Sequence, residues 1–520
     1  MSRTDGKLCL LAFAIFCALL IRYLYIIIWR LYFSPVAKFP GPKLAAITSL
    51  YEFYYDFVKK GRYCYEIERM HKVYGPIVRI NPRELSICDS DYYDKLYVGG
   101  YVRPTEIDAQ FVSGIGFERT FFLTVPHALH RKLRKPFEPY FSCVGVMRIE
   151  GLINDCARKL MKRFEDLKDS ERVVRLDHAM LAYTGDVVGH ICVDNPKELI
   201  ADENFAPEWY NLHHSMVRCI PLLQQIPWAI NILKKIPRGL VQWIDPKFDA
   251  FSAWAEAANK HIEEVVMEKR TMTAKRPADL GGKMTVFRQL VNDDTLDDSE
   301  WSSKRLSMEA QILMGAGSVS PARTLHFITF FLLSNEPMRK RLELELTDIM
   351  VDWPASPPKW AQLEKLPYLQ AVIKEGLRHS YGTMHRLPRI SACNLQYKEW
   401  TIPSGVPVGM TAYLQHTDLG VFPNPFEFKP DRWLGPDTNA SRQMHRNLVP
   451  FSRGSRNCIG MHLAYAEVTL LLAALFRPGA PRMELFETDE TDVIAAHDYI
   501  VPLPRLDSKG VRVVIRSKAS

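Results

Sequence analysis

The 520-residue sequence predicts a mainly α protein with a small β-rich patch, preceded by an apolar N-terminal segment. Two long apolar runs, residues 308–333 and 461–476, are typical of buried helices because they are much longer than strands. Residues 75–82 and 85–88 are short apolar segments bounded by Gly, Pro and Asn, which is the pattern of strands. Residues 8–29 are almost entirely apolar, and a stretch of about 22 residues can cross a bilayer.

The N-terminal segment is predicted to be an uncleaved membrane anchor over residues 1–33. Residues 8–21 are unbroken apolar sequence, Arg22 interrupts them, and residues 23–29 continue the run. A signal peptide is the alternative, but Arg22 and the bulky residues after it make a poor cleavage site. The aromatic residues at its end suit the membrane interface: they are Tyr23, Tyr25, Trp29 and Tyr32.

Residues 34–44 are predicted to form a proline-rich hinge, because Pro35, Pro40 and Pro42 cannot continue a helix. The catalytic or binding part of the protein would then cover residues 45–520. Basic residues follow the anchor on this side, which favours a cytosolic location for the globular part: they are Arg30, Lys38 and Lys43.

Several segments of the middle region carry specific expectations. Residues 99–125 are irregular and rich in Gly and Phe, and residues 145–275 show helical periodicity with polar breaks. Within the second region, residues 211–243 contain apolar segments that are broken by proline. These segments are followed by Lys234, Lys235 and Arg238. This stretch is either a lid whose apolar tips touch a membrane or a set of ordinary core loops. Residues 271–298 are polar and are expected to be an exposed connection.

A short helix is predicted from His130 to Lys135, ending before Pro136. His130 and Arg134 are four residues apart and share a face that can hold an anionic group. Arg131 and Lys135 share a neighbouring face that can meet an acidic protein. A solvated basic face is the alternative for both pairs.

The apolar run 308–333 predicts a long helix of about 39 Å, at ~1.5 Å per residue. It contains Gly315-Ala316-Gly317-Ser318-Val319-Ser320-Pro321, which is not a phosphate-binding loop, since no strand precedes it and no lysine follows. Pro321 has no amide hydrogen, so the carbonyl of Gly317 loses its usual donor and a kink is expected. The alternative is an ordinary buried helix whose small residues permit close packing.

The most specific stretch runs from Phe451 to Gly460, F-S-R-G-S-R-N-C-I-G. Cys458 lies just before a helix, where the dipole and free amides favour a thiolate. Gly454 and Gly460 let the backbone approach a flat ligand, and Arg456 adds a fixed positive charge. Such a thiolate suits an iron whose other positions are already filled, as in haem. The alternative is a buried structural cysteine.

Composition excludes several classes of protein. The net charge is only +8, from 67 basic and 59 acidic residues, and no basic stripe with interleaved aromatics points to nucleic acid. The ten cysteines form no C-x-x-C pair, which argues against structural zinc and a disulfide framework and favours a reducing compartment. Residues 498–503 and 510–515 are expected to pair as a C-terminal β-hairpin.

The pattern F-x-x-G-x-R-x-C-x-G resembles the haem loop of the haem-thiolate monooxygenases, the cytochrome P-450 family. Upstream, Glu375-Gly376-Leu377-Arg378 in the helical run 369–379 and Phe428 to Trp433 occur in the order that this family has. On its own, E-x-x-R is usually a surface ion pair. The resemblance covers nearly the whole chain from Phe39 and implies a mainly α fold with a small β-rich lobe in one large domain.

The resemblance also implies roles for individual residues. Cys458 would be the axial ligand of haem b (iron protoporphyrin IX), in a loop that includes Phe451 and Arg456. Three residues match positions that contact the haem propionates: His130, Arg134 and Arg389. For Arg389 a surface charge is the alternative. A buried network would brace the haem loop: Glu375, Arg378 and Arg432.

This sequence departs from the family pattern at two places. His130 stands where the family usually has Trp. In the central helix the family has an acid followed by threonine, whereas this chain has Val319, Ser320 and then Pro321. Ser320 keeps a hydroxyl that can order the water needed for proton delivery, so we expect it to be catalytic, while Val319 cannot relay a proton.

The implied reaction is insertion of one oxygen atom from O2 into a lipophilic substrate. Electrons would come from NADPH through a separate cytochrome reductase, because this chain has no nucleotide- or flavin-binding motif. The residues of these motifs are most similar to those of fungal microsomal members of the family, which act on terpenoids and polyketides. This implies a single-pass protein of the endoplasmic reticulum with a cytosolic catalytic domain, in which the sequon at Asn439 stays unused.

Two other functions stay open at this point. The altered turn at Val319, Ser320 and Pro321 is compatible with a haem-thiolate isomerase or dehydratase that does not activate O2. A non-catalytic haem sensor or electron carrier is the second, although the anchor and the apolar lid speak against it. The sequence does not identify the substrate, whose cavity would be formed by residues 99–125, residues 211–243 and the helix near Ala316.

Overall fold

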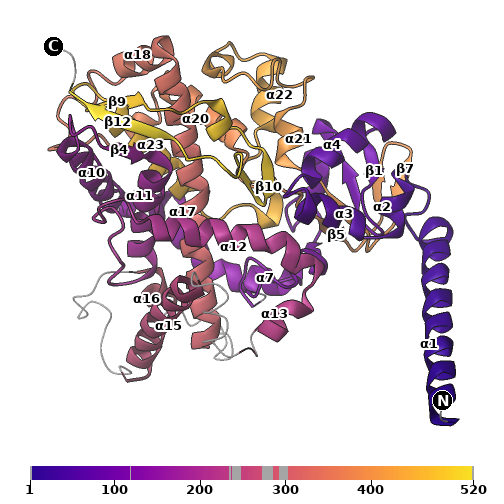
Figure 1. The fold of residues 1–520 in the computed structure, drawn as a ribbon. Coiled ribbons are helices and arrows are strands. Elements are labelled where there is room, and N and C mark those ends of the chain that lie inside the picture. The colour runs from indigo at the N-terminus through magenta and orange to yellow at the C-terminus, as the bar shows by residue number, and fades with distance from the viewer. Residues whose placement is uncertain are drawn as a thin grey trace.

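The computed structural model describes residues 3–117, 119–233, 236, 248–271, 285–291 and 302–517. Figure 1 shows a mainly helical body from which one N-terminal helix projects. The α-helices are α1 (Arg3–Ile28), α2 (Lys43–Ile47), α3 (Leu50–Phe53), α4 (Tyr63–Tyr74), α5 (Tyr93–Leu96), α6 (Ala109–Val112), α7 (His127–Arg134), α8 (Glu138–Phe141), α9 (Cys143–Arg148), α10 (Glu150–Asp166), α11 (Leu176–Cys192), α12 (Pro207–Gln225), α13 (Trp228–Leu233), α15 (Phe248–Thr271), α16 (Val286–Val291), α17 (Ser303–Ser334), α18 (Glu336–Glu345), α19 (Trp360–Leu363), α20 (Pro367–Ser380), α21 (Ala412–His416), α22 (Asn439–Asn447) and α23 (Met461–Phe476).

Short strands make up the β-structure of the described chain. The largest sheet has the order β1-β2-β8-β5-β3 and forms the predicted β-rich lobe. The strands are β1 (Ile77–Arg79), β2 (Leu85–Ile87), β3 (Thr105–Ile107), β4 (Val173–Arg175), β5 (Arg389–Ser391), β6 (Leu395–Tyr397), β7 (Trp400–Ile402), β8 (Pro407–Gly409), β9 (Arg482–Leu485), β10 (His497–Tyr499), β11 (Val501–Leu503) and β12 (Arg512–Arg516). Helices make up 56% of the structure and the sheets are small, which confirms the predicted mainly α fold class.

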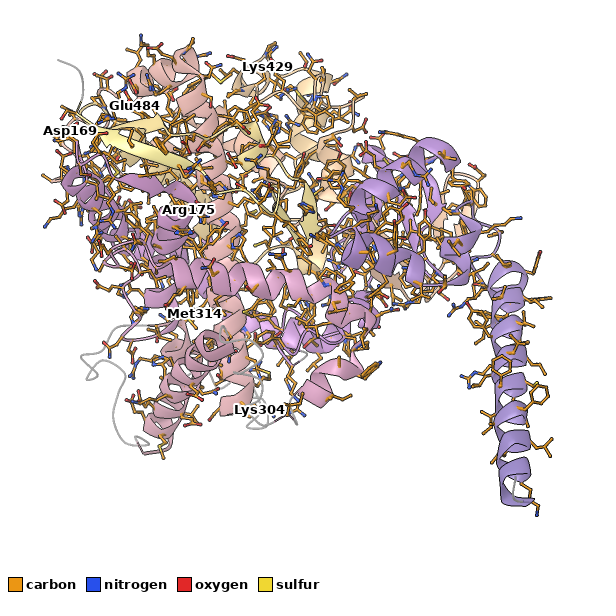
Figure 2. The ribbon with its side chains drawn as sticks, viewed as in Figure 1. Asp169, Arg175, Lys304, Met314, Lys429 and Glu484 are labelled. Atoms are coloured by element: carbon orange, nitrogen blue, oxygen red, sulfur yellow. The ribbon has the colours of Figure 1, made fainter. Side chains whose placement is uncertain are left out.

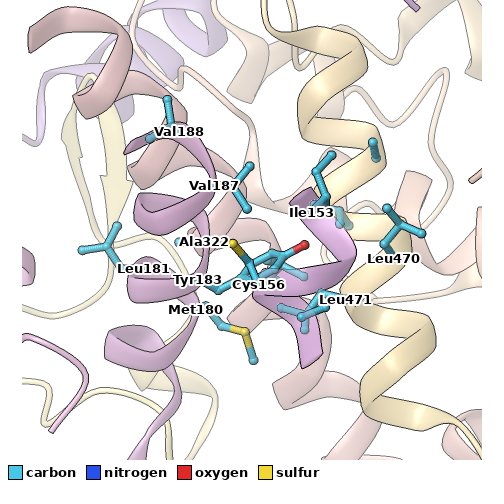
Figure 3. Close-up of a cluster of buried hydrophobic side chains, with 14 of the residues drawn as sticks. Ile153, Cys156, Met180, Leu181, Tyr183, Val187, Val188, Ala322, Leu470 and Leu471 are labelled. Carbon is cyan, nitrogen blue, oxygen red and sulfur yellow. The ribbon is translucent and has the colours of Figure 1, made fainter. Parts of the chain in front are cut away.

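The main core lies where α10, α11, α17 and α23 meet. Figure 3 shows Ile153 and Cys156 of α10 beside Leu470 and Leu471 of α23, with Ala322 of α17 nearby. These side chains are at most 3% exposed, so the helices that carry them have little freedom to shift. The core therefore holds α17 against the helix that follows Cys458.

The N-terminal helix α1 stands clear of the body (Figure 1). In α1 the apolar side chains project on all sides (Figure 2), and residues 10–33 are apolar and long enough to cross a membrane. After it, Arg79 joins the N-terminal region to the β-rich lobe: its guanidinium donates to the carbonyls of Arg30 at 2.7 Å and Pro82 at 2.7 Å. Phe39, within residues 34–44, is 5% exposed, so this segment packs on the lobe.

Four expectations about local structure were wrong. The C-terminal strands do not form one hairpin: β10 pairs with β11, whereas β12 pairs with β4 and β9. The helix α12 runs through Pro221 to Gln225. Within residues 271–298, the described part forms α16, with Val286 and Phe287 buried. Residues 99–125 contain β3 and α6.

Candidate functional site

Cys458 lies in the loop between a turn of 3₁₀ helix, Gly454–Arg456, and the N-terminus of α23. Its amide donates to the carbonyl of Phe451 at 2.9 Å, which closes the loop on itself. Cys458 is exposed to solvent in part of its surface. Many protein atoms nevertheless lie close to the sulfur, and the resulting desolvation raises the pKa of the thiol. The Gly460 amide and the charge of Arg134 act in the opposite direction and favour the thiolate.

The two glycines of this loop have different roles. Gly454 has φ +74°, and a Cβ there would lie 2.3 Å from the carbonyl oxygen of Val98. It is therefore required for packing of the loop on the protein, and not for approach of a ligand. A Cβ on Gly460 would meet no atom within 4 Å. The space beside this glycine is therefore open, as the close approach of a flat ligand requires.

Two arginines lie near this loop, one buried and one half-buried, and neither forms an ion pair with a carboxylate among the described residues. Arg389, at the start of β5, is 4% exposed, and burial lowers its pKa. Arg456 donates to the carbonyls of Thr124 at 2.8 Å and Val125 at 2.7 Å, while its Nε has no hydrogen-bond partner among the described residues. Burial, together with the charges of Arg389 and Arg134, lowers the pKa of Arg456 to about 9. Although the charge of Glu106 acts in the opposite direction on Arg456, positive charge concentrated in this way favours an anionic ligand.

Arg134 and His130 complete this basic group from α7. Arg134 donates to the carbonyl of Asn457 at 2.6 Å and to its side chain at 3.0 Å, and it pairs with Glu138. It is thus bound directly to the residue before Cys458. His130 is 2% exposed, and burial together with the nearby arginines lowers its pKa to about 3, so it is neutral. No described group bonds to the Nδ1 atom of His130.

These features fit haem b. Haem b is an iron porphyrin that carries two carboxylates. The accessible thiol could bind its iron, the open space beside Gly460 could admit its flat ring, and the basic side chains near the loop could bind its carboxylates. Phe451 lies on the same loop, with its ring 5.3 Å from that of Tyr465. The residues that would hold the group are therefore Cys458, with Arg456, Arg389, Arg134 and His130.

Glu375 is fully buried at the centre of a hydrogen-bond network. Arg378 binds it with two hydrogen bonds, from Nε at 3.0 Å and from an Nη at 2.8 Å, and Arg432 donates from Nε at 3.1 Å. Burial alone would raise the pKa of Glu375, but hydrogen bonds from His379 and Arg378 outweigh burial, and the pKa is lowered. The structure thus brings together the three residues that the sequence motifs suggested.

Sequence reasoning missed three members of this network. Trp433 donates from its indole to Glu375 at 2.9 Å, and His379 lies 3.4 Å from the same carboxylate. His416 accepts the Val449 amide at 2.8 Å, while its other ring nitrogen lies 2.8 Å from the Arg378 carbonyl. Trp433 lies in the segment from Phe428 to Trp433 that the sequence pattern identified. No local pattern around His416 indicates that this residue joins Arg378 to Val449.

The altered turn of α17 remains helical. The hydroxyl of Ser320 donates to the carbonyl of Ala316 at 3.2 Å, and Ala316 is exposed although α17 crosses the core. Gly317 packs on α11, where a Cβ would meet Val188 at 2.8 Å, and Thr184 of α11 donates to the Ser318 carbonyl at 2.8 Å. The small residues therefore permit close packing on α11 on one face, while Ala316 is exposed on the other.

An apolar cluster includes Ile312, which lies one helical turn before Ala316. It is formed by residues of the 99–125 region together with Ile312 of α17 and Leu387. Its other members are Ile107, Phe111, Val112, Ile115, Phe117, Leu123 and Val125. Lys234, Lys235 and Arg238, which were expected to follow a membrane-touching lid, lie outside the described residues.

Comparison with known proteins gives one matching family. A family model described as Cytochrome P450 matches residues 50–478 of this chain. Among curated relatives, the cytochrome P450 monooxygenase oblB of Aspergillus clavatus is 50% identical over 497 residues, which cover 95% of each chain.

Two further relatives have names that describe a reaction or product. The fusicoccadiene C-8 hydroxylase of Phomopsis amygdali is 44% identical over 500 residues, covering 96% of this chain and 95% of its own. The stellatic acid synthase of Emericella variicolor is 39% identical over 515 residues, covering 94% of this chain and 92% of its own.

Proposed function

Because this chain belongs to the cytochrome P450 family, and is thus a haem-binding monooxygenase, we propose that it oxidises a terpenoid hydrocarbon in fungal secondary metabolism. The monooxygenase names of its relatives argue against the isomerase and sensor alternatives. The name fusicoccadiene C-8 hydroxylase denotes hydroxylation of a diene at one carbon. The observation that carries the substrate class is the apolar cluster that includes Ile312, which suits a hydrocarbon better than a charged substrate.

In this proposal Cys458 would supply the thiolate that binds the haem iron. Arg134, Arg389 and Arg456 would neutralise the propionates, and His130 would offer a neutral ring nitrogen to the same group. Haem supplies the oxygen chemistry when it is bound. The chain's own contribution is to hold the thiolate beside the Gly460 amide, to exclude water with the apolar cluster, and to order a proton-delivering water at Ser320. The residues of the Glu375 network are positioning residues.

The proposed electron donor is an NADPH-cytochrome reductase that docks on the exposed basic face of α7. Arg131 and Lys135 line a surface hollow of about 300 Å³ that also reaches Gly454 and Asn457 of the Cys458 loop. Electrons entering there would have a short path to the thiolate. Acidic side chains of a reductase would complement this face.

The proposed location is the endoplasmic reticulum membrane, with residues 1–33 as a single-pass anchor, residues 34–44 as the connection and residues 45–520 as a cytosolic catalytic domain. The apolar α1 supports an anchor. Expression of the full chain should give a membrane-bound protein that 1 M salt does not release, because salt screens charge but does not extract an apolar helix. Release by salt, or a glycan on Asn439, would contradict this arrangement.

The substrate proposal is tested by supplying fusicoccadiene to microsomes that contain the full chain and a reductase. A product heavier by the mass of one oxygen atom, formed only with both NADPH and O2, is expected. Turnover without NADPH would instead support an isomerase. If fusicoccadiene is untouched while a polyketide precursor gains oxygen, the terpenoid substrate class is wrong.

A further inference from the structure

Glu309 is the single acidic residue of α17, and it is completely buried. It lies seven residues before Ala316, so both occupy the same face of the helix, two turns apart. Its Oε1 accepts a hydrogen bond from Arg305 at 2.8 Å and another from the backbone amide of Phe121 at 2.7 Å. A buried carboxylate on the central helix thus reaches out to a loop far away in the sequence.

The loop that Glu309 holds, residues 119–125, has no helix or strand of its own. Thr124 stabilises it internally through a hydrogen bond to the Thr120 carbonyl at 2.7 Å. At its far end, Arg456 of the Cys458 loop donates to the carbonyls of Thr124 and Val125. Residues 119–125 are therefore held by hydrogen bonds at two places, to Glu309 of α17 and to Arg456 of the Cys458 loop.

The same loop contributes to the apolar cluster that includes Ile312 of α17. Leu123 is 1% exposed and packs with Ile312, which is one helical turn from Glu309. Because a loop without regular structure follows its attachment points, the position of Leu123 depends on the hydrogen bond from Phe121 to Glu309.

We propose that Glu309 is a positioning residue for oxidation: it fixes residues 119–125 on α17 and thereby sets the apolar wall against which the substrate is oriented. This inference rests on the proposed function for its effect on products, but its structural part does not. An amide hydrogen needs only an acceptor oxygen, so a glutamine amide is sufficient and a hydrocarbon side chain is not.

The structural part is tested by limited trypsin digestion of the full-length holoprotein, because Arg119 is exposed at the start of the loop. Glu309→Leu should raise the initial rate of cleavage after Arg119 by about tenfold, since proteolysis follows the population of the open loop. Glu309→Gln should cleave like the parent protein. Cleavage after the exposed Arg442 of α22 serves as the internal reference and should not change.

The matched control is Gln311→Leu. Gln311 is 5% exposed on the same helix, and among the described residues its side chain donates to Ser307 at 3.3 Å and forms no hydrogen bond with residues 119–125. Equal cleavage after Arg119 in Glu309→Leu and Gln311→Leu would overturn the proposal. So would a Glu309→Gln protein that cleaves as fast as Glu309→Leu, because the acceptor oxygen would then not matter.

The functional part uses fusicoccadiene as the probe, with the reduced CO spectrum showing that each variant contains intact haem protein. Glu309→Leu should lose about tenfold in product per NADPH, or spread oxidation over more positions, because a ~1 Å misplacement is enough for such losses. Glu309→Gln should restore the parent pattern. An unchanged product pattern in a Glu309→Leu protein whose loop is open would overturn the link to oxidation. If the parent does not oxidise fusicoccadiene, only the substrate class fails, and the digestion still decides the role of Glu309.

Discussion

The Nε2 atom of His416 accepts a hydrogen bond from the backbone amide of Val449 at 2.8 Å. The other ring nitrogen lies 2.8 Å from the carbonyl of Arg378, the arginine that binds Glu375. Since the Val449 carbonyl in turn accepts the amide of Ser452 at 3.1 Å, His416 joins the Glu375 network to the start of the Cys458 loop. A neutral imidazole, with one donor and one acceptor, is suited to this link.

Replacement of His416 should therefore loosen the Cys458 loop. We expect His416→Phe to lower the free energy of unfolding by about 1–3 kcal/mol, the usual cost of stranding buried polar groups. Haem content should fall with it. His445→Phe, at an exposed position of α22, is the control. Chemical denaturation and the haem-to-protein absorbance ratio measure both effects, and equal losses in the two variants would contradict a specific link.

The buried histidines predict a loss of stability in mild acid. Burial lowers the pKa of His326 and His416 to about 3, and that of His213 and His214 to about 4. An unfolded histidine binds a proton near pH ~6.5. Between these values the unfolded state binds more protons, so stability should fall as the pH drops from about 6.5 toward 4.

This pH dependence is measured as the free energy of unfolding by urea at several pH values from 7.5 to 5. In His416→Gln, which keeps a donor and an acceptor but does not titrate, the slope should be smaller than in the parent protein. Stability that is flat over this range would show that these histidines are not neutral in the folded state.

Loss of the central carboxylate should be more severe. Glu375→Ala leaves Arg378 and Arg432 as buried cations without their partner, which typically costs about 3–5 kcal/mol. We expect little folded haem protein from this variant. Glu309→Gln provides a comparison at another buried carboxylate whose hydrogen bonds an amide can retain. Normal haem content and thermal stability in Glu375→Ala would refute the bracing role of the network.

Ser320→Ala should uncouple the enzyme without stopping electron consumption. If the hydroxyl orders the water that delivers protons, NADPH use should persist while product falls and hydrogen peroxide rises. Ser318→Ala is the matched control, because that hydroxyl bonds to the Met314 carbonyl at 2.7 Å and is fully buried against α11. Unchanged product per NADPH in Ser320→Ala would remove Ser320 from the mechanism.

Local features of the fold could be predicted from the sequence, and long-range pairing could not. The helix α23 matches the predicted residues 461–476, because its apolar run and the glycine before it are local signals. The pairing of β12 with β4 joins segments more than 300 residues apart, and no local pattern encodes it. Proline was expected to interrupt the apolar stretch 211–243, but α12 continues through Pro221 to Gln225, because packing of a helix can outweigh local propensity.

The same distinction applies to the candidate site. The motifs identified Cys458 and Glu375, because the order of short patterns is visible in sequence. The resemblance to a family was needed to place Arg389 and Arg456 in one basic cluster. His416 and Glu309 carry no motif, and only the structure shows that each connects two distant segments through buried hydrogen bonds.

The central claim, that Cys458 is the thiolate ligand of haem in a monooxygenase, is tested most directly by the absorbance spectrum of the reduced, CO-bound full-length protein. The parent protein should show the red-shifted Soret band that marks thiolate ligation, and Cys219→Ala, at an exposed cysteine, should show it too. Cys458→Ala should lose this band. Retention of the band by Cys458→Ala with haem still bound would contradict the account.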